Sequence, residues 1–264
     1  MFFDTFAENA QLFFLIFVRI MALVLIAPLI SSRSIPFIAR IGLALFAAIA
    51  VFPMVQGAGY PIPDTGLEYA ALVVGEIMVG IILGFILVVI YAAFLLAGQF
   101  FSLQMGFGAS QVFDPLSQIQ IPIMGQFLNL IAMFTFVMIG GFQRIFLIGV
   151  YRSFERVQVY DFITQRNYIF RLFLGSLGNL FEQALIISLP ILGTLFLVSI
   201  SMGLLAKAAP QMNLLMMGFP VAIGVAFTML FLILPFLVEA FAKIIDASFY
   251  KILELLDQAG GASP

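Results

Sequence analysis

The stretch GQFFSLQMGFGASQVFDP, residues 98–115, brings glycines, amides and aromatic side chains together in the middle of an otherwise apolar chain. Backbone that is not helical is tolerated at membrane depth only where it is buried in protein or lines a water-filled cavity, because lipid cannot satisfy its N–H and C=O groups. The stretch therefore predicts a flexible loop that lines a conduit and takes part in opening or closing it.

The composition places this loop in a membrane protein. Of the 264 residues, 64% are hydrophobic and 9% are charged, whereas an average soluble domain has roughly 25% charged residues. Uncharged runs longer than the ~20 residues of a membrane-crossing helix occur at 41–63, 77–113, 115–143, 183–206 and 208–238. We therefore predict an all-α integral membrane protein with five or six long helices.

Several functional classes conflict with the composition. A formal net charge of −2 leaves no basic surface for nucleic acid, which is bound through clustered Lys and Arg. The chain has no cysteine and no histidine, which excludes thiol nucleophiles, disulfides, imidazole proton relays and nearly all zinc sites. We expect no cofactor and no metal. The first eleven residues contain Asp4 and Glu8 but no basic residue, so we expect no cleavable signal peptide.

Capping, proline and glycine signals divide the chain into helices. Thr65 and Glu68 form a capping box, and the helix that it opens, 66–97, would be around 45 Å long at ~1.5 Å per residue. Pro53 and the glycines and prolines that follow it predict a connector. The polar turn 207–211 predicts a hairpin of the two helices beside it. The expected helices cover 10–30, 36–55, 66–97, 122–143, 172–205 and 212–238, with an amphipathic helix from 239 onward.

The positive-inside rule gives no consistent orientation for these helices. With six alternating crossings, Arg33 and Arg40 fall on the opposite side from the arginine-rich segment 144–171. Either one helix pair is re-entrant, or the chain is not an ordinary lipid-embedded bundle. We favour the second alternative because several helices are too long, too rich in glycine or too kinked by proline to be simple spans.

Three charged residues lie inside apolar segments. Arg19, Glu76 and Glu182 would each be costly in lipid if they were unpaired, so we expect each to have a partner. They could form a polar relay or a latch between subunits, or they could be structural pairs that hold helices in register, which is the alternative we favour. A proton-driven transporter would need more such charges converging on one site at the midplane.

An enzyme would have to use a serine–lysine dyad, since no histidine is present to act as the base. Ser31, Ser32 or Ser201 would then pair with Lys207. Serines are common at helix interfaces and this lysine lies in a predicted turn. We therefore predict that the chain is not an enzyme.

Apolar side chains in the predicted loop lie among glycines. Flexible apolar groups of this kind can close a narrow opening by excluding water and can then move apart. A plain re-entrant connector is the alternative. The residues concerned are Phe100, Phe101, Met105, Phe107, Val112 and Phe113.

Five separated segments resemble the FliR family, in the family's order and over nearly the whole chain. They are SSRSIP at 31–36, RIGLAL at 40–45, GQFFSLQMGFGASQVFDP at 98–115, GLLAKAAPQMN at 203–213 and GFP at 218–220. The resemblance implies a single-copy subunit of the export gate of the flagellar type III protein secretion apparatus. The virulence-injectisome counterpart is similar in fold, and a proton-coupled secondary transporter is the alternative from a different class.

The resemblance also implies how the chain is organised. One copy would join several FliP and FliQ subunits in a closed helical channel in the bacterial inner membrane, within the flagellar basal body, partly raised toward the periplasm. Unfolded flagellar proteins would pass through the channel. The implied parts are a FliP-like helical part at 1–150 with a plug loop at 104–118, a polar connector at 151–171, a FliQ-like helical hairpin at 172–238, and an amphipathic C-terminal helix and tail at 239–264.

Site residues are carried over by matching motif. The tip 207–213 is implied to contact other subunits near the cytoplasmic entrance. The plug that would block the pore comprises Gln104, Met105, Gly106, Phe107, Gly108, Val112, Phe113, Asp114 and Pro115. The residues expected to make subunit contacts or structural pairs are Arg19, Arg33, Glu76, Glu182, Lys207 and Pro210.

Overall fold

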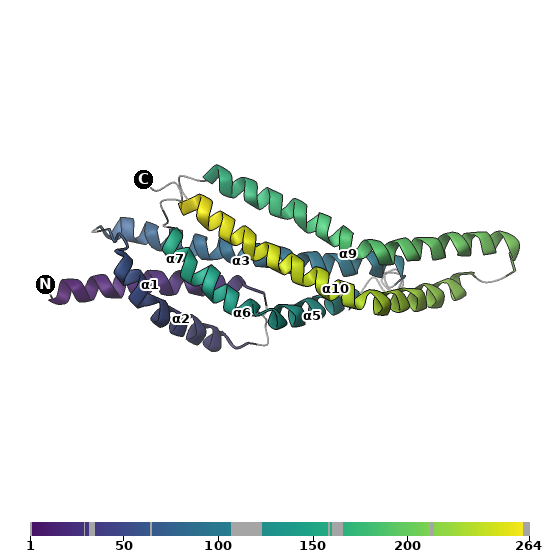
Figure 1. Ribbon diagram of the computed structural model, residues 1–264, viewed down its shortest axis with the longest axis horizontal. Helices are drawn as coiled ribbons and strands as arrows, with labels where there is room; N and C mark the ends of the chain where they lie inside the picture. Colours follow the sequence, from purple (N-terminus) through teal and green to yellow (C-terminus); the bar gives the residue numbers. More distant parts are fainter. Residues whose placement is uncertain are drawn as a thin grey trace. The chain divides into compact units, whose positions relative to one another are not determined.

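The described part of the chain is built of helices. The computed structural model describes residues 2–28, 30–31, 35–63, 65–106, 123–157, 159, 166–211 and 214–260, and within these residues it contains no β-strand (Figure 1). Within these described residues, five helices are long and apolar enough to cross a membrane, and the segments 123–138 and 141–156 together could supply a sixth. The prediction of an all-α membrane protein with five or six long helices is confirmed.

The first three helices are α1 (Phe2–Ile26), α2 (Phe37–Ala58) and α3 (Gly66–Gln104). After residue 122 come α5 (Ile123–Met138), α6 (Gly141–Arg144), the π-helix η1 (Ile145–Arg152) and α7 (Ser153–Arg156). Two long helices, α9 (Arg166–Ala208) and α10 (Leu214–Gly260), complete the described chain. A connection at 209–213 joins α9 to α10, as predicted for the hairpin. In this hairpin, Thr194 of α9 and Val221 and Thr228 of α10 line one shallow apolar groove.

The structure corrects the predicted loop at its beginning. Residues 98–104 are helical, because α3 continues to Gln104 instead of ending at 97. The helix is maintained here by packing, since Phe101 is buried and Gly98 lies against the backbone of Gly125 in α5. The turn comes at Gly106, whose φ is +91° and whose N–H donates to the carbonyl of Leu103 at 3.1 Å. Residues 107–115 of the predicted loop lie outside the described residues.

Two further helices continue past their predicted ends. α2 includes Pro53 and extends to Ala58, where Gly59 adopts a left-handed φ of +70° and caps the helix. α10 is continuous from Leu214 to Gly260, so the amphipathic helix predicted from 239 is its second half and not a separate element. Its apolar face is buried as the spacing predicts, at Phe241, Ile245, Phe249, Ile252 and Leu256. Neither Pro53 in α2 nor the change in polarity at 239 in α10 ends its helix, because the packing of the apolar faces outweighs both signals.

The chain forms two compact units. Unit 1 comprises residues 1–89, 140–176 and 246–264, and unit 2 comprises 90–139 and 177–245. These units are spatial clusters, and the division at 150, 171 and 238 that the family resemblance implies stays a prediction.

Glycines set the helix contacts within each unit. In unit 1, a Cβ atom at Gly80 of α3 would lie 2.4 Å from the carbonyl oxygen of Arg19 in α1, so the two backbones touch. In unit 2, a Cβ atom at Gly98 of α3 would lie 2.4 Å from the Cα of Gly125 in α5. The rings of Tyr91 and Phe136 pair at the other end of this contact, 6.0 Å apart between centroids. α3 and α5 therefore pack antiparallel.

Replacing Gly80 with alanine tests the α1–α3 contact. Gly80→Ala should lower the free energy of unfolding by about 1–3 kcal/mol, because the new methyl group overlaps the Arg19 carbonyl and the helices must separate. Gly42→Ala on α2 is the matched control, because nothing lies within 4 Å of a Cβ atom there. Thermal unfolding of the detergent-solubilised protein, followed by circular dichroism, measures both. Equal unfolding temperatures for the two variants would contradict the contact.

Candidate functional site

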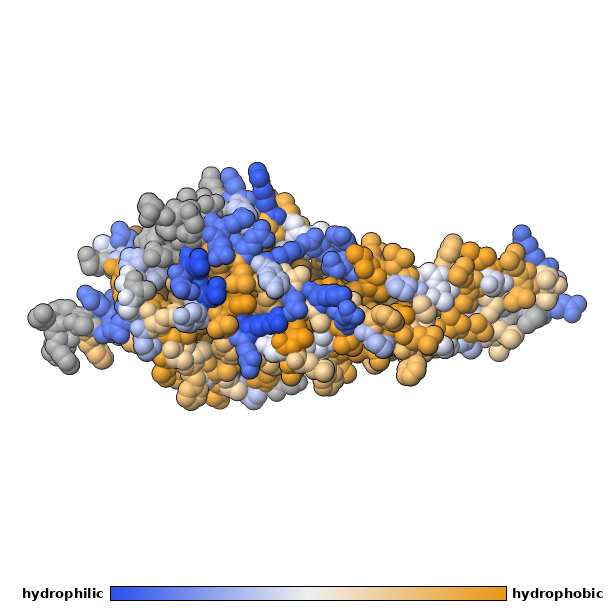
Figure 2. Space-filling model, viewed as in Figure 1, coloured by the Kyte–Doolittle hydropathy of each residue, from blue (hydrophilic) through white to orange (hydrophobic). Residues whose placement is uncertain are grey.

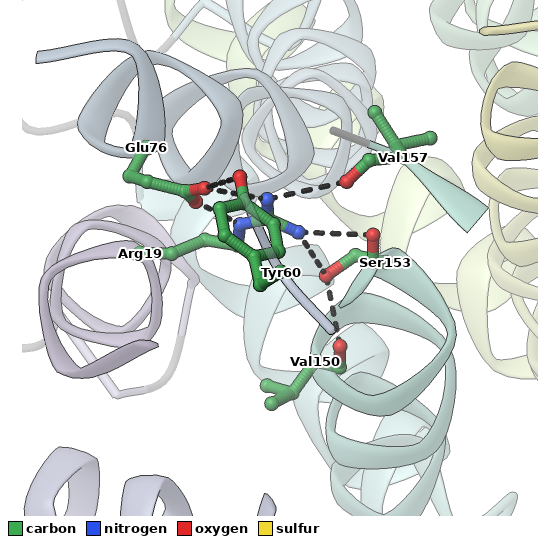
Figure 3. Close-up of polar contacts among 6 residues, drawn as sticks. All are labelled: Arg19, Tyr60, Glu76, Val150, Ser153 and Val157. Atoms are coloured by element: carbon green, nitrogen blue, oxygen red, sulfur yellow. Dashed lines mark hydrogen bonds and ion pairs between the residues drawn. The ribbon is translucent and has the colours of Figure 1, made fainter. Parts of the chain in front are cut away.

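Two of the three charges predicted inside apolar segments form one buried ion pair. Arg19 of α1 and Glu76 of α3 are 1% and 0% exposed, so both are removed from water and from lipid (Figure 3). The Nε of Arg19 donates to one carboxylate oxygen of Glu76, and a terminal guanidinium nitrogen donates to the other at 3.0 Å. This two-point geometry gives a guanidinium–carboxylate pair both additional energy and a defined orientation.

The other guanidinium hydrogens of Arg19 bind the segment that follows η1. One terminal nitrogen donates to the carbonyl oxygen of Ser153 at 2.9 Å and to its hydroxyl at 3.3 Å. The second also donates to the carbonyl oxygen of Val157 at 3.3 Å, and the guanidinium lies 3.8 Å from the ring centre of Phe154. All five N–H groups of the arginine are thereby used, and the aromatic face adds a cation–π contact.

Tyr60 and Ser153 extend this network on either side. The hydroxyl of Tyr60, in the connection between α2 and α3, donates to Glu76. Burial raises the pKa of Tyr60 above its usual value, so the phenol keeps its proton and remains a donor at physiological pH. The hydroxyl of Ser153 donates to the carbonyl of Val150 at the end of the π-helix at 2.8 Å (Figure 3). The cluster joins α1, α3, the 59–65 connection and η1–α7 of unit 1.

This cluster fits the structural alternative for Arg19 and Glu76. Each charge has its counter-charge, and the donors of the arginine are all used within unit 1. Removing one member of such a pair leaves an uncompensated buried charge. The expectation that these two residues have partners is confirmed.

The remaining predicted contact residues lie elsewhere. Glu182 is exposed on α9 and has no ion-pair partner among the described residues. Lys207 is exposed in the last turn of the same helix, and Pro210 is exposed in the connection to α10. Arg33 lies outside the described residues. The partner expected for Glu182 stays a prediction.

The described beginning of the predicted plug is anchored within unit 2. The side-chain amide of Gln104 donates to the hydroxyl of Ser199 in α9 at 3.3 Å, and Met105 is buried. A Cβ atom at Gly106 would lie 2.2 Å from the ring of Phe219 in α10, so only glycine fits both this contact and the positive φ. The other predicted plug residues, outside the described residues, are Phe107, Gly108, Val112, Phe113, Asp114 and Pro115.

The helix that follows the predicted plug is also held by a close contact within unit 2. α5 begins at Ile123, two residues before the Gly98–Gly125 contact with α3. The stretch between 106 and 123 therefore begins and ends in unit 2, on helices that pack against each other. Sequence reasoning missed Ser199 and Phe219, as it missed Tyr60, Ser153 and Phe154, because each contact joins residues that are distant in the sequence.

The long helices α9 and α10 leave most of their apolar surface uncovered. Only 22% of the most apolar window of α9 and 17% of that of α10 is buried, against 61% for α3. Apolar side chains cover most of the α9 and α10 surface of unit 2 on the face drawn in Figure 2. Surface of this kind is stable in contact with lipid or with other apolar helices, and not with water.

Comparison of the sequence with known proteins places this chain in a family. Residues 10–248 match the family described as bacterial export proteins, family 1. The flagellar biosynthetic protein FliR of Bacillus subtilis (strain 168) is 34% identical over 220 residues, which are 83% of this chain and 84% of the relative. The chain belongs to the FliR family. FliR of Borreliella burgdorferi is 33% identical over 75% of this chain and 73% of its own length, and FliR of Escherichia coli (strain K12) is 28% identical over 92% and 91%.

The buried pair of this FliR-family chain is tested by removing one charge. Arg19→Met should lower the free energy of unfolding by about 3–5 kcal/mol, because Glu76 is left buried without a counter-charge. The double variant Arg19→Met with Glu76→Leu should recover most of this loss. Lys243→Met, which breaks the exposed pair with Glu239 on α10, is the control and should leave the unfolding temperature unchanged. A double variant as unstable as the single one would contradict the pairing.

Proposed function

We propose that this chain is the single-copy subunit of the export gate of the flagellar type III protein secretion apparatus. It completes a channel made with FliP-like and FliQ-like subunits and plugs the pore of that channel. Unfolded flagellar proteins displace the plug as they are exported. Membership in a family of bacterial export proteins, whose named relatives are flagellar biosynthetic proteins, supports the flagellum over the injectisome.

One structural observation carries the plug. The described residues of the 104–118 stretch end at Gly106, which lies against Phe219, and α5, the helix that follows the stretch, is held by the contact of Gly125 with Gly98. Flanks held in this way allow a glycine-containing apolar stretch to move without disturbing the helices. We propose that the apolar residues Phe107, Val112 and Phe113 close the channel by excluding water.

The uncovered helices support a heteromeric assembly. α3, α9 and α10 have 39, 43 and 47 residues, which at ~1.5 Å per residue gives about 58, 64 and 70 Å. These lengths far exceed the ~30 Å hydrocarbon core of a bilayer. Apolar helices that extend beyond lipid need other apolar helices around them. We propose that FliP-like and FliQ-like subunits surround them in the inner membrane of the flagellar basal body, in an assembly partly raised toward the periplasm.

The remaining expectations fit this role. We propose that the exposed residues Lys207 and Pro210, at the tip of the hairpin of α9 and α10, contact other subunits near the cytoplasmic entrance. The buried Arg19–Glu76 pair has its donors fully used, which does not favour a proton-coupled transporter. The chain acts without catalysis of its own and without a cofactor, and energy for export comes from elsewhere in the apparatus.

Shortening the plug tests its sealing role. Deletion within 106–113, or the double change Phe107→Gly with Phe113→Gly, should make the assembled complex leak ions, because the apolar side chains that exclude water are lost. The measurement is ion conductance of the complex with FliP-like and FliQ-like subunits in planar bilayers. Phe6→Gly with Phe37→Gly removes two exposed phenylalanines of unit 1 and should leave the conductance low. An assembled plug variant with unchanged conductance would refute the proposal.

A further inference from the structure

Two buried polar atoms without a hydrogen-bond partner lie on one pair of helices of unit 2. The hydroxyl of Tyr91 on α3 and the side-chain carbonyl oxygen of Asn129 on α5 are both buried, and neither has a partner among the described residues. Tyr91 as a whole is 7% exposed. A phenol is a hydrogen-bond donor and a carboxamide oxygen is an acceptor, so each atom could satisfy the other.

The hydroxyl of Tyr91 destabilises the observed arrangement of these helices. Its ring packs edge-on against the rings of Phe94 and Phe136, at 6.1 and 6.0 Å between centroids, and a phenylalanine would make the same contacts. A buried donor without a partner costs the desolvation of that group, whereas an apolar group of the same shape does not. Nearly all buried polar groups in folded proteins have a partner. The hydroxyl therefore indicates a second arrangement in which it has one.

The packing of α3 and α5 sets how large the change must be. Gly98 of α3 lies against Gly125 of α5 and the two helices are antiparallel, so Asn129 is level with Phe94. Tyr91 lies three residues, about 4.5 Å, further along the axis. Moving α5 by about one turn, ~5.4 Å, toward the N-terminus of α3 brings Asn129 level with Tyr91.

The contact between these helices permits such a shift. Small residues form part of its buried surface, at Ala93 and Ala97 on α3 and at Gly125 and Ala132 on α5, so only hydrogens or methyl groups project from these positions. α5 has 16 residues and is followed by Gly140, whose φ is +71°. Residues at the ends of elements absorb the backbone rotation when a helix moves. α5 can therefore move along α3 as a rigid helix.

We propose that α3 and α5 have a second register, shifted by about one turn, in which the hydroxyl of Tyr91 donates to the side-chain carbonyl of Asn129. The contact of Gly98 with Gly125 favours the observed register, and this hydrogen bond favours the shifted one. The shift draws Ile123, where α5 begins, away from the C-terminal end of α3. That the shift regulates the export gate rests on the proposed function, whereas the existence of two registers does not.

Spin labels measure the register directly, because the chain has no cysteine of its own. Gln99→Cys on α3 and Phe134→Cys on α5, both at exposed positions, are labelled in the full chain assembled with the FliP-like and FliQ-like subunits. Double electron–electron resonance should give two distances, which differ by up to one turn, ~5.4 Å. Tyr91→Phe and Asn129→Leu should each lower the population at the longer distance about tenfold, which corresponds to ~1.4 kcal/mol.

Thermal unfolding of the same complex distinguishes an unpartnered hydroxyl from a partnered one. Tyr91→Phe should raise the unfolding temperature by about 2–4 °C, because the observed register loses a buried donor that has no acceptor. Tyr60→Phe removes a hydroxyl that donates to Glu76 and should lower the unfolding temperature. Tyr250→Phe, on an exposed side chain, is the matched control and should change neither the temperature nor the two distances.

The double variant Tyr91→Phe with Asn129→Leu shows whether the two groups act together. If they bond only in the shifted register, the double variant should lose no more of the longer-distance population than either single variant does. The two gains in unfolding temperature should add, because the groups do not interact in the observed register. A general loosening of the helices would not separate the two measurements in this way.

Three results would overturn the proposal: a single distance that the variants do not alter, an unfolding temperature of Tyr91→Phe at or below that of the wild type, or population losses that add in the double variant. The plug is judged separately. If both registers are found but the shortened 106–113 segment does not leak, the plug fails and the register shift stands. If one register is found and the shortened segment leaks, the register shift fails and the plug stands.

Discussion

The buried pair of Arg19 and Glu76 is the constraint on which unit 1 depends. Removing two charges from water costs several kcal/mol for each ion, and their attraction offsets this cost only when every hydrogen-bonding group is used. Arg19 meets that condition through Glu76, Ser153 and Val157 together. Sliding α1 by one turn along α3 would break every one of these contacts. The polar cluster therefore fixes a register that apolar packing alone leaves open, because neighbouring turns of an apolar helix offer similar surfaces.

Glycine makes the same register sterically specific. Gly80 lies against the Arg19 carbonyl itself, and a Cβ atom at Gly84 would lie 3.0 Å from the side chain of Ile26. Because these glycines have no side chain, α1 can pack directly against the backbone of α3. Gly75 leaves comparable space for Val159, where a Cβ atom would lie 2.2 Å from the valine methyl group. The residues that weaken α3 as an isolated helix are thus the ones that let it contact its neighbours closely, and burial of 61% of its most apolar window follows from this.

The sequence predicts the existence of the long helices well, because continuous hydrophobicity is a local property. It fails at boundaries where packing outweighs local preference. Residues 98–104 read as a loop because of Gly98 and the amides Gln99 and Gln104, yet Gly98 is the contact with α5 and Gln104 binds Ser199. A buried arginine inside an apolar segment is enough to predict that Arg19 has a partner. The identity of that partner cannot be predicted from the local sequence, since Glu76 and Ser153 are 57 and 134 residues away along the chain.

Two carboxylates in apolar segments of this chain, Glu76 and Glu182, differ in how the cost of their charge is offset. Glu76 is satisfied from within, by a guanidinium and a phenol that the fold brings to it. Glu182 lies on an exposed side of a helix that is 22% buried over its most apolar window, where the described chain offers it nothing. A protein that spans lipid alone would gain stability by replacing such a residue with leucine. The expected counter-charge of Glu182 therefore stays a prediction, whereas that of Glu76 is supplied by the fold itself.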